Sequence, residues 1–172
     1  MRYIAIIAGV IVAVVLIVLV VGWSLPVKHR ATADATVNAS PQSLYQLITA
    51  VDRFPEWRSS VKSIEHATDS AGKTRFREVG SNGSILYEVA DAVPNHRLVT
   101  KIADPSLPFG GTWTYELSPR GDSTTLRITE DGEVYNPVFR FVSRFVMGHT
   151  GTINKYLEDV RHHFEKTSAS GA

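Results

Sequence analysis

Residues 39–57 read ASPQSLYQLITAVDRFPEW. Ser40 followed by Pro41 is typical of a helix start, because serine caps the first turn and proline is accepted at the first helical position. Apolar residues then recur at the spacing of one helix face: Leu44, Leu47, Ile48 and Val51. A second short helix is expected around residues 54–57. The stretch therefore predicts a pair of short helices.

Strands are predicted on both sides of this helical pair. Residues 31–38 alternate, with Ala31, Ala33, Ala35 and Val37 on one face, and a period of two indicates a strand. Asn82-Gly83 is a strong hairpin signal. Six further runs with strand character follow the pair: 61–67, 73–79, 84–90, 97–102, 111–117 and 124–130. The helical pair thus separates the first strand from the rest of the sheet in the chain.

The same alternation predicts which strand residues face the interior. Four inward rows combine aliphatic, aromatic and a few polar side chains: Ile85, Tyr87 and Val89; Leu98, Thr100 and Ile102; Trp113, Tyr115 and Leu117; Leu126, Ile128 and Glu130. The opposite faces carry charged and hydroxyl side chains, which suits solvent.

A long amphipathic helix is predicted from Asn136-Pro137 onward. Its apolar residues form two stripes: Val138, Phe141, Val142 and Phe145, then Ile153, Tyr156, Leu157, Val160 and Phe164. Gly148 and Gly151 lie between the stripes, and a glycine inside a helix costs about 1 kcal/mol relative to alanine. Either the helix breaks there, or the glycines leave space between helix and sheet. Residues 167–172 resemble a flexible tail.

Residues 3–23 form an apolar run without charge or proline. As a helix the run spans roughly 30 Å, the thickness of the hydrocarbon core of a bilayer. The alternative is a cleaved secretory signal, since Ala31-Thr32-Ala33 resembles a cleavage site, but a signal's apolar region usually spans about 7–15 residues. A retained single-pass anchor is favoured. Arg2 on one side nearly balances Lys28 and Arg30 on the other, which leaves the side of the domain open.

Composition limits the functions of the remaining chain. Of 172 residues, about 140 follow the anchor, enough for one domain. The absence of cysteine excludes disulfides and thiolate chemistry. Arg2, Lys28 and Arg30 flank the anchor, and without them the 18 basic residues fall to 15 against 17 acidic ones. This balance argues against nucleic acid as a partner.

The order of these elements resembles the START-like (SRPBCC) superfamily, in its polyketide cyclase/dehydrase and lipid-transport branch. The similarity covers residues 28–166, and its local marks are residues 39–48, Asp52 to Trp57, and Asn136 through Leu157. The resemblance implies an α+β helix-grip fold: a curved antiparallel sheet of about seven strands around a long C-terminal helix, which here follows the transmembrane helix predicted from residues 3–23. Together with the apolar run and the polar C-terminal end, this gives an anchor and basic segment at 1–30, the domain at 31–166 and the tail at 167–172.

Motifs for metal or nucleophilic chemistry are missing. The six histidines lack ligand spacing, and no Gly-x-Ser-x-Gly motif occurs, so we expect no metal and no cofactor. Glu130 is the catalytic candidate: at the end of an inward row, its carboxylate could point into a cavity with a raised pKa. The alternative is a strand-end residue in solvent. Arg140 and Arg144 either hold an anionic headgroup or form a solvated face paired with acidic residues.

The helix-grip resemblance implies an internal apolar cavity. The cavity candidates are Tyr87, Thr100, Trp113, Tyr115, Ile128, Glu130, Phe141, Phe145, Gly148 and Gly151. The leading hypothesis is a membrane-anchored binding module for an apolar small molecule, a lipid or a polyketide- or isoprenoid-like compound. A cyclase or dehydratase using the same cavity is the alternative, and a protein-interaction scaffold is a further one. The expected partners are the bilayer, through residues 3–23, and the ligand; the oligomeric state is left open.

Overall fold

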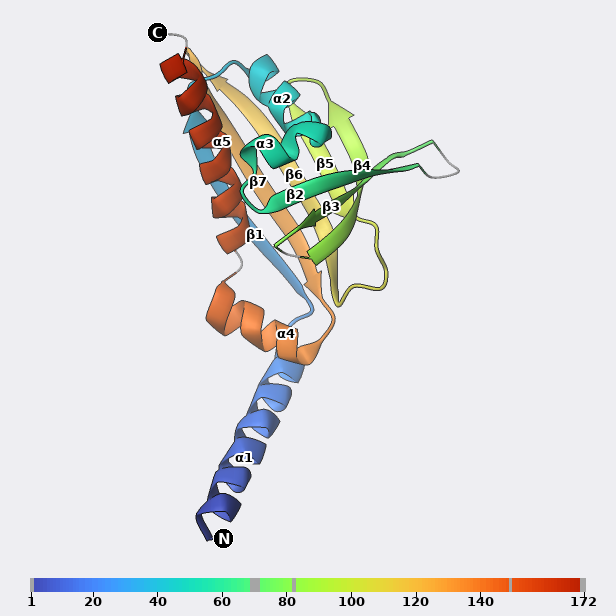
Figure 1. Cartoon of the computed structure of the whole chain (residues 1–172), viewed down its shortest axis with the longest axis vertical. Helices are drawn as coiled ribbons and strands as arrows, with labels where there is room; N and C mark the ends of the chain where they lie inside the picture. The colour runs from blue at the N-terminus through green and yellow to red at the C-terminus, as the bar shows by residue number, and fades with distance from the viewer. Residues whose placement is uncertain (1, 69–71, 82, 149, 171–172) are drawn as a thin grey trace.

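The computed structural model describes residues 2–68, 72–81, 83–148 and 150–170. Its centre is one curved, antiparallel seven-stranded sheet in the order β1-β7-β6-β5-β4-β3-β2, with helices packed on one side (Figure 1). The strands are β1 (Lys28–Val37), β2 (Val61–Thr68), β3 (Thr74–Gly80), β4 (Gly83–Val93), β5 (Arg97–Ile102), β6 (Phe109–Arg120) and β7 (Ser123–Val134). The seven-stranded helix-grip prediction is confirmed.

The inward face of the sheet forms the core of the domain. Leu98, Tyr115 and Leu117 are buried as the alternation predicts. In the register, Tyr115 lies opposite both Leu98 of β5 and Ile128 of β7. Side chains directly opposite each other on one face are close enough to pack, which joins the three strands into one apolar surface.

The helical pair forms α2 (Pro41–Thr49), the short 3₁₀ turn η1 (Val51–Arg53) and α3 (Phe54–Trp57). The Ser40 side chain accepts a hydrogen bond from the backbone N–H of Ser43 at 3.1 Å, the N-cap interaction that the sequence predicts. Leu44, Leu47 and Ile48 of α2 are buried in the core.

The C-terminal helix is broken, so the expectation of one long helix from Asn136 is wrong and the alternative of a break is correct. The pieces are α4 (Pro137–Val142), the π-helical turn η2 (Ser143–Met147) and α5 (Gly151–Ser170). Gly148 ends η2 with φ 71° and ψ 158°, a conformation that is essentially restricted to glycine. The chain therefore turns at Gly148 and sends α4 and α5 in different directions (Figure 1).

Of the two C-terminal helices, α5 packs into the core, whereas α4 has no buried residue. Ile153, Tyr156, Leu157 and Val160 form the buried stripe of α5. The buried Asp159 accepts hydrogen bonds at 3.1 Å from the backbone N–H and the hydroxyl of Ser59, just after α3. Residues 167–170, predicted as a flexible tail, are the last part of this helix; residues 171–172 lie outside the described part.

The N-terminal helix α1 (Arg2–Ser24) extends away from the domain (Figure 1). It is long and apolar enough to cross a membrane, and none of its most apolar stretch is buried by the rest of the protein. Near its end, a Cβ on Gly22 would lie 2.1 Å from the carbonyl oxygen of Pro137. The glycine therefore permits close packing of α1 on α4.

The two glycines between α4 and α5 should respond oppositely to alanine. Gly148→Ala should lower the free energy of unfolding by about 1–3 kcal/mol, because its conformation is nearly restricted to glycine. Gly151→Ala should be neutral or stabilising by up to about 1 kcal/mol, since its added Cβ meets open space. Denaturant unfolding of the full chain in detergent measures both, and equal effects would contradict the broken helix.

Candidate functional site: a cavity between the helical pair and the sheet

A cavity of about 250 Å³ lies between the helical pair and the inward face of strands β3 to β6. Most of its wall is apolar or aromatic, and its polar residues come from several elements. The lining residues are Tyr45, Ile48, Thr49, Val51, Phe54, Arg58, Thr74, Phe76, Glu78, Tyr87, Val89, Ala92, Leu98, Thr100, Trp113, Tyr115 and Thr152. Mostly apolar pockets with a few polar groups are typical of small-molecule sites.

Strand alternation and one β-bulge bring these side chains together. Tyr87 and Val89 point inward as the alternation in β4 predicts. The register with β5 then shifts between Val89 and Asp91. A bulge inserts one residue and reverses which residues face inward. Ala92 therefore also lines the cavity, although it is an odd number of residues from Val89.

A buried ion pair stands in the cavity wall. Arg58 follows α3, and both of its terminal nitrogens donate hydrogen bonds to the Glu78 carboxylate on β3. The bond from Nη2 to Oε1 is 3.1 Å long. The side chains are only 12% and 9% exposed. The guanidinium carbon of Arg58 also lies 4.9 Å from the ring centres of Phe54 and Tyr156, within range for a cation–π interaction.

The pair of Arg58 and Glu78 is neutral as a unit. Burial favours the uncharged form of Arg58, but the Glu78 carboxylate together with Tyr156 and Tyr115 outweighs that effect and leaves the pKa of the guanidinium above its usual value. Arg58 therefore stays a cation, with its charge compensated by Glu78. The cavity wall presents a polar but uncharged surface at this point.

Buried tyrosines supply further neutral polar groups. Burial raises the pKa of Tyr87 and raises the pKa of Tyr115 to about 12. Tyr115 shares hydrogen bonds with Thr100 and with Tyr156 of α5, whose own pKa burial also raises. At neutral pH these phenols are protonated, so they act as hydrogen-bond donors and not as bases.

Four of the ten cavity candidates lie in this wall: Tyr87, Thr100, Trp113 and Tyr115. The other six lie outside it. Ile128 is fully buried in the core. Phe141 on α4 and Phe145 on η2 contact each other, with tilted rings whose centres are 5.0 Å apart. Gly148 and Gly151 are exposed, but Thr152, which follows Gly151, reaches the cavity.

Glu130 lies outside the cavity as well. Its carboxylate is 3.4 Å from Nε2 of His29 on the neighbouring strand, with the two side chains 22% and 15% exposed. A Cβ on Gly132 would lie 2.3 Å from the His29 ring, so this glycine makes room for the contact. The structure therefore places Glu130 in a contact between β1 and β7, neither in the cavity nor free in solvent.

Arg58 and Glu78 are the charged site residues that sequence reasoning missed. Phe76 and Glu78 are two residues apart on β3, and both are buried. The alternation that singled out Glu130 would also have placed Glu78 inward. No comparable signal exists for Arg58, which follows a helix. Within the described residues, no group of three or more His, Asp or Glu side chains converges to hold a metal ion.

Glu88 is a buried carboxylate outside the site. It sits between Tyr87 and Val89 and therefore points to the opposite face of the sheet. Lys101, Arg75 and Lys73 donate hydrogen bonds to it and lower its pKa to about 2. Its 1% exposure reflects cover by these long cationic side chains. Glu88 holds three strands together and takes no part in the cavity.

A curved sheet that wraps a helix over an apolar cavity defines a helix-grip domain. The family model described as "Polyketide cyclase / dehydrase and lipid transport" matches residues 28–164, and the chain belongs to this family. No curated protein matches the chain significantly.

Solved structures with the same fold include a START superfamily protein from Mycobacterium smegmatis, with a TM-score of 0.65, 18% identity and coverage of 81% of this chain and 99% of that one. The protein TTHA0849 from Thermus thermophilus has a TM-score of 0.65 and 19% identity, with coverage of 81% of this chain and 99% of that one. A norcoclaurine synthase point mutant from Thalictrum, in complex with a transition-state analogue, has a TM-score of 0.64 and 12% identity. The match covers 84% of this chain and 98% of that one. At these identities the likeness establishes the fold alone.

The buried tyrosines predict a loss of stability at alkaline pH. In the unfolded chain tyrosine ionises near pH 10, whereas Tyr115 in the folded protein ionises at about 12. The folded state then holds more protons between these values, so the free energy of unfolding falls as pH rises through that window. Denaturant unfolding at several pH values measures this, and Tyr115→Phe should reduce the slope. A slope unchanged by that substitution would contradict the assignment.

Proposed function

We propose that this protein is a membrane-anchored binding module that holds an apolar, uncharged small molecule in the cavity. The observation that carries the proposal is an aromatic cavity whose one buried ion pair is internally neutralised. A ligand charge placed there would be desolvated without a free counter-ion, which is costly. A ligand with an apolar body and a hydroxyl or carbonyl oxygen avoids that cost and can accept a hydrogen bond from a wall tyrosine.

The volume supports a ligand of modest size. Drug-sized ligands occupy pockets of roughly 300–1,000 Å³, and this cavity is about 250 Å³. Within the classes of lipid and polyketide- or isoprenoid-like compounds, this favours a short isoprenoid or a one- or two-ring molecule over a two-chain phospholipid.

Helix α1 supports retention of the anchor over cleavage of a signal. Beyond its apolar length, its C-terminal end is integrated with the domain. Nη1 of Arg140 on α4 donates a 2.6 Å hydrogen bond to the carbonyl oxygen of Leu25, which follows α1. Gly22 packs on Pro137 at the same junction. Cationic side chains stabilise the C-terminal end of a helix, and a removable signal needs no such contacts with the mature domain.

The cyclase or dehydratase alternative now depends on Glu78, the carboxylate that lines the cavity. Its two oxygens each accept a hydrogen bond from Arg58, which favours a structural role over proton transfer. Turnover of a polyketide-like substrate by the full chain, and its loss in Glu78→Gln with ligand binding retained, would favour the enzyme over the binding module.

Filling the cavity should abolish ligand retention. Val89→Phe adds volume inside the wall, whereas Val99→Phe makes the same change on β5 at a residue outside the lining. Native mass spectrometry of full-length protein released from nanodiscs should detect a bound small molecule in the parent and in Val99→Phe, and none in Val89→Phe. Equal occupancy in both variants, or an empty parent protein, would contradict the proposal.

The neutral wall predicts discrimination by ligand charge. Geraniol and geranate share a ten-carbon skeleton and differ in the charge of the head group, so geraniol should bind at least about tenfold more tightly at neutral pH. Glu78→Gln leaves Arg58 uncompensated and should shift the preference toward geranate. Calorimetric titration of full-length protein in detergent measures both, after a thermal melt verifies that the variant is folded. Tighter binding of geranate to the parent protein would disprove the neutral-ligand assignment.

A further inference from the structure

The segment formed by α4 and η2, residues 137–147, exposes apolar side chains on its outer face. Four of them are among the more exposed large apolar residues of the domain: Val138 (42%), Phe139 (52%), Phe145 (59%) and Val146 (73%). Positions seven apart lie on nearly the same side of a helix, which pairs Val138 with Phe145 and Phe139 with Val146. The four side chains therefore form a continuous apolar face.

Two polar residues of the same segment, Arg140 and Ser143, are half-buried against the protein, whereas Arg144 is exposed. Arg140, Ser143 and Arg144 line a second cavity of about 340 Å³, together with residues 25–30 and Val134. A helix on the surface of a soluble domain has the opposite arrangement, with apolar residues inward and charges outward. Segment 137–147 is thus partly inverted, since four of its large apolar side chains are exposed while Arg140 and Ser143 are half-buried, and water is a poor match for its outer face.

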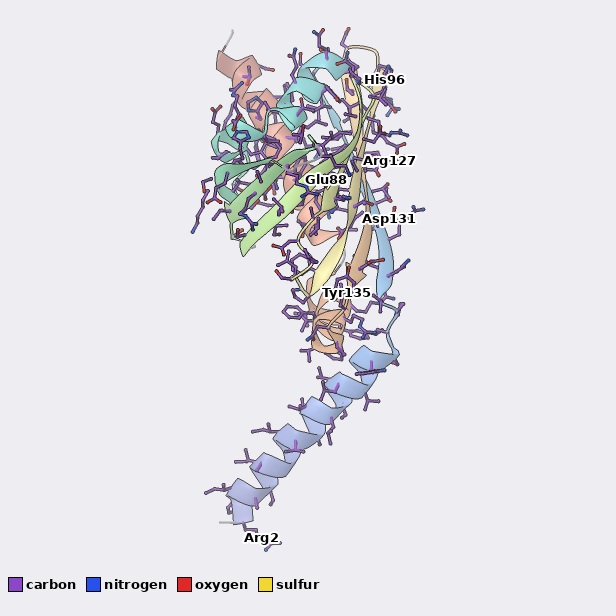
Figure 2. The ribbon with its side chains drawn as sticks, turned by 90° about the vertical axis from the view of Figure 1, so that its right-hand side faces the viewer. Arg2, Glu88, His96, Arg127, Asp131 and Tyr135 are labelled. Carbon is purple, nitrogen blue, oxygen red and sulfur yellow. The ribbon has the colours of Figure 1, made fainter. Side chains whose placement is uncertain are left out.

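This inverted segment begins where α1 enters the domain. Pro137 packs on Gly22, and α4 crosses the end of α1 (Figure 1). Two large aromatic residues at the junction are exposed, Trp23 at 76% and Tyr135 at 49%. Tyr135 lies at the α1 end of the domain, and His96 at the opposite end (Figure 2). Tryptophan and tyrosine are enriched at membrane–water interfaces.

We propose that segment 137–147 is a second membrane contact, which lies in the interfacial layer of the bilayer with its apolar face toward the acyl chains. The inference rests on the proposed role of α1 as a membrane span. The occupant of this face is the bilayer because the face is continuous with α1. A helix in the interface buries its apolar side and keeps its charges at the headgroup level.

The arginines fit this placement. Nη1 of Arg140 donates to the carbonyl of Leu25 and so fixes α4 to the end of α1. Lys28 and Arg30 have acidic partners in Glu133 and Asp131. Within the described residues, Arg140 and Arg144 have no carboxylate at ion-pairing distance, so neither belongs to the acidic-paired surface considered from the sequence. At headgroup depth Arg144 meets lipid phosphates.

The contact would fix the orientation of the domain. A single helix followed by a short connection leaves the domain free to tilt on the membrane. Insertion of both α1 and segment 137–147 gives the domain two attachments to the bilayer, which restricts its tilt. It holds the sheet and the start of α5 at a defined height above the bilayer.

Depth measurements on the full chain test the proposal. The native sequence has no cysteine, so single substitutions can carry a nitroxide label: Phe145→Cys or Val146→Cys on the segment, Val12→Cys in α1, and His96→Cys as the aqueous reference. The labelled proteins are placed in nanodiscs of phosphatidylcholine and phosphatidylglycerol. Collision with oxygen, which concentrates in lipid, is compared with collision with a water-soluble nickel chelate.

The expected result is high oxygen and low nickel accessibility at residues 145 and 146, at a shallower depth than residue 12. Aqueous values at 145 and 146, equal to those at 96, with residue 12 in lipid would overturn this inference and leave the anchor intact. Aqueous values at residue 12 would instead remove the proposed membrane span. Low accessibility to both reagents at 145 and 146 indicates burial against protein, such as a second copy of the chain, and overturns the inference too.

Discussion

The Arg58 guanidinium connects the parts of the domain that form the cavity. It follows α3, pairs with Glu78 on β3 and lies against the ring of Tyr156 on α5. Loss of one partner of a buried pair leaves an uncompensated charge, which costs several kcal/mol. Arg58 therefore couples the positions of the helical pair, of β3 and of α5. The same pair determines that the cavity is polar without being charged.

The break at Gly148 separates two roles that the sequence pattern combines. Beyond it, α5 turns its apolar stripe to the sheet and completes the core. Before it, α4 and η2 leave the sheet, and α4 packs on the end of α1. A continuous helix would direct both apolar stripes along one axis. The glycine permits a backbone conformation that other residues avoid, and so the first stripe lies beside the end of α1.

The sequence predicts the strands, the helical pair and four cavity residues because each depends on local periodicity. Tyr87, Thr100, Trp113 and Tyr115 alternate within their strands, and alternation survives in the folded sheet. The prediction was less successful where a residue's role depends on a distant partner. Glu130 shares the alternation, but its neighbour across the sheet is His29, and a pairing about one hundred residues apart leaves no local mark.

The sequence alone determined the apolar length of the first helix, the order of the secondary structure and the inward rows of the sheet, since these follow from composition and spacing within short segments. Only the tertiary structure decided that Arg58 and Glu78 meet, that a bulge in β4 brings Ala92 to the cavity, and that segment 137–147 faces outward with its apolar side. These features arise from contacts between elements far apart in the chain, whose geometry is set by packing and by the backbone at Gly148.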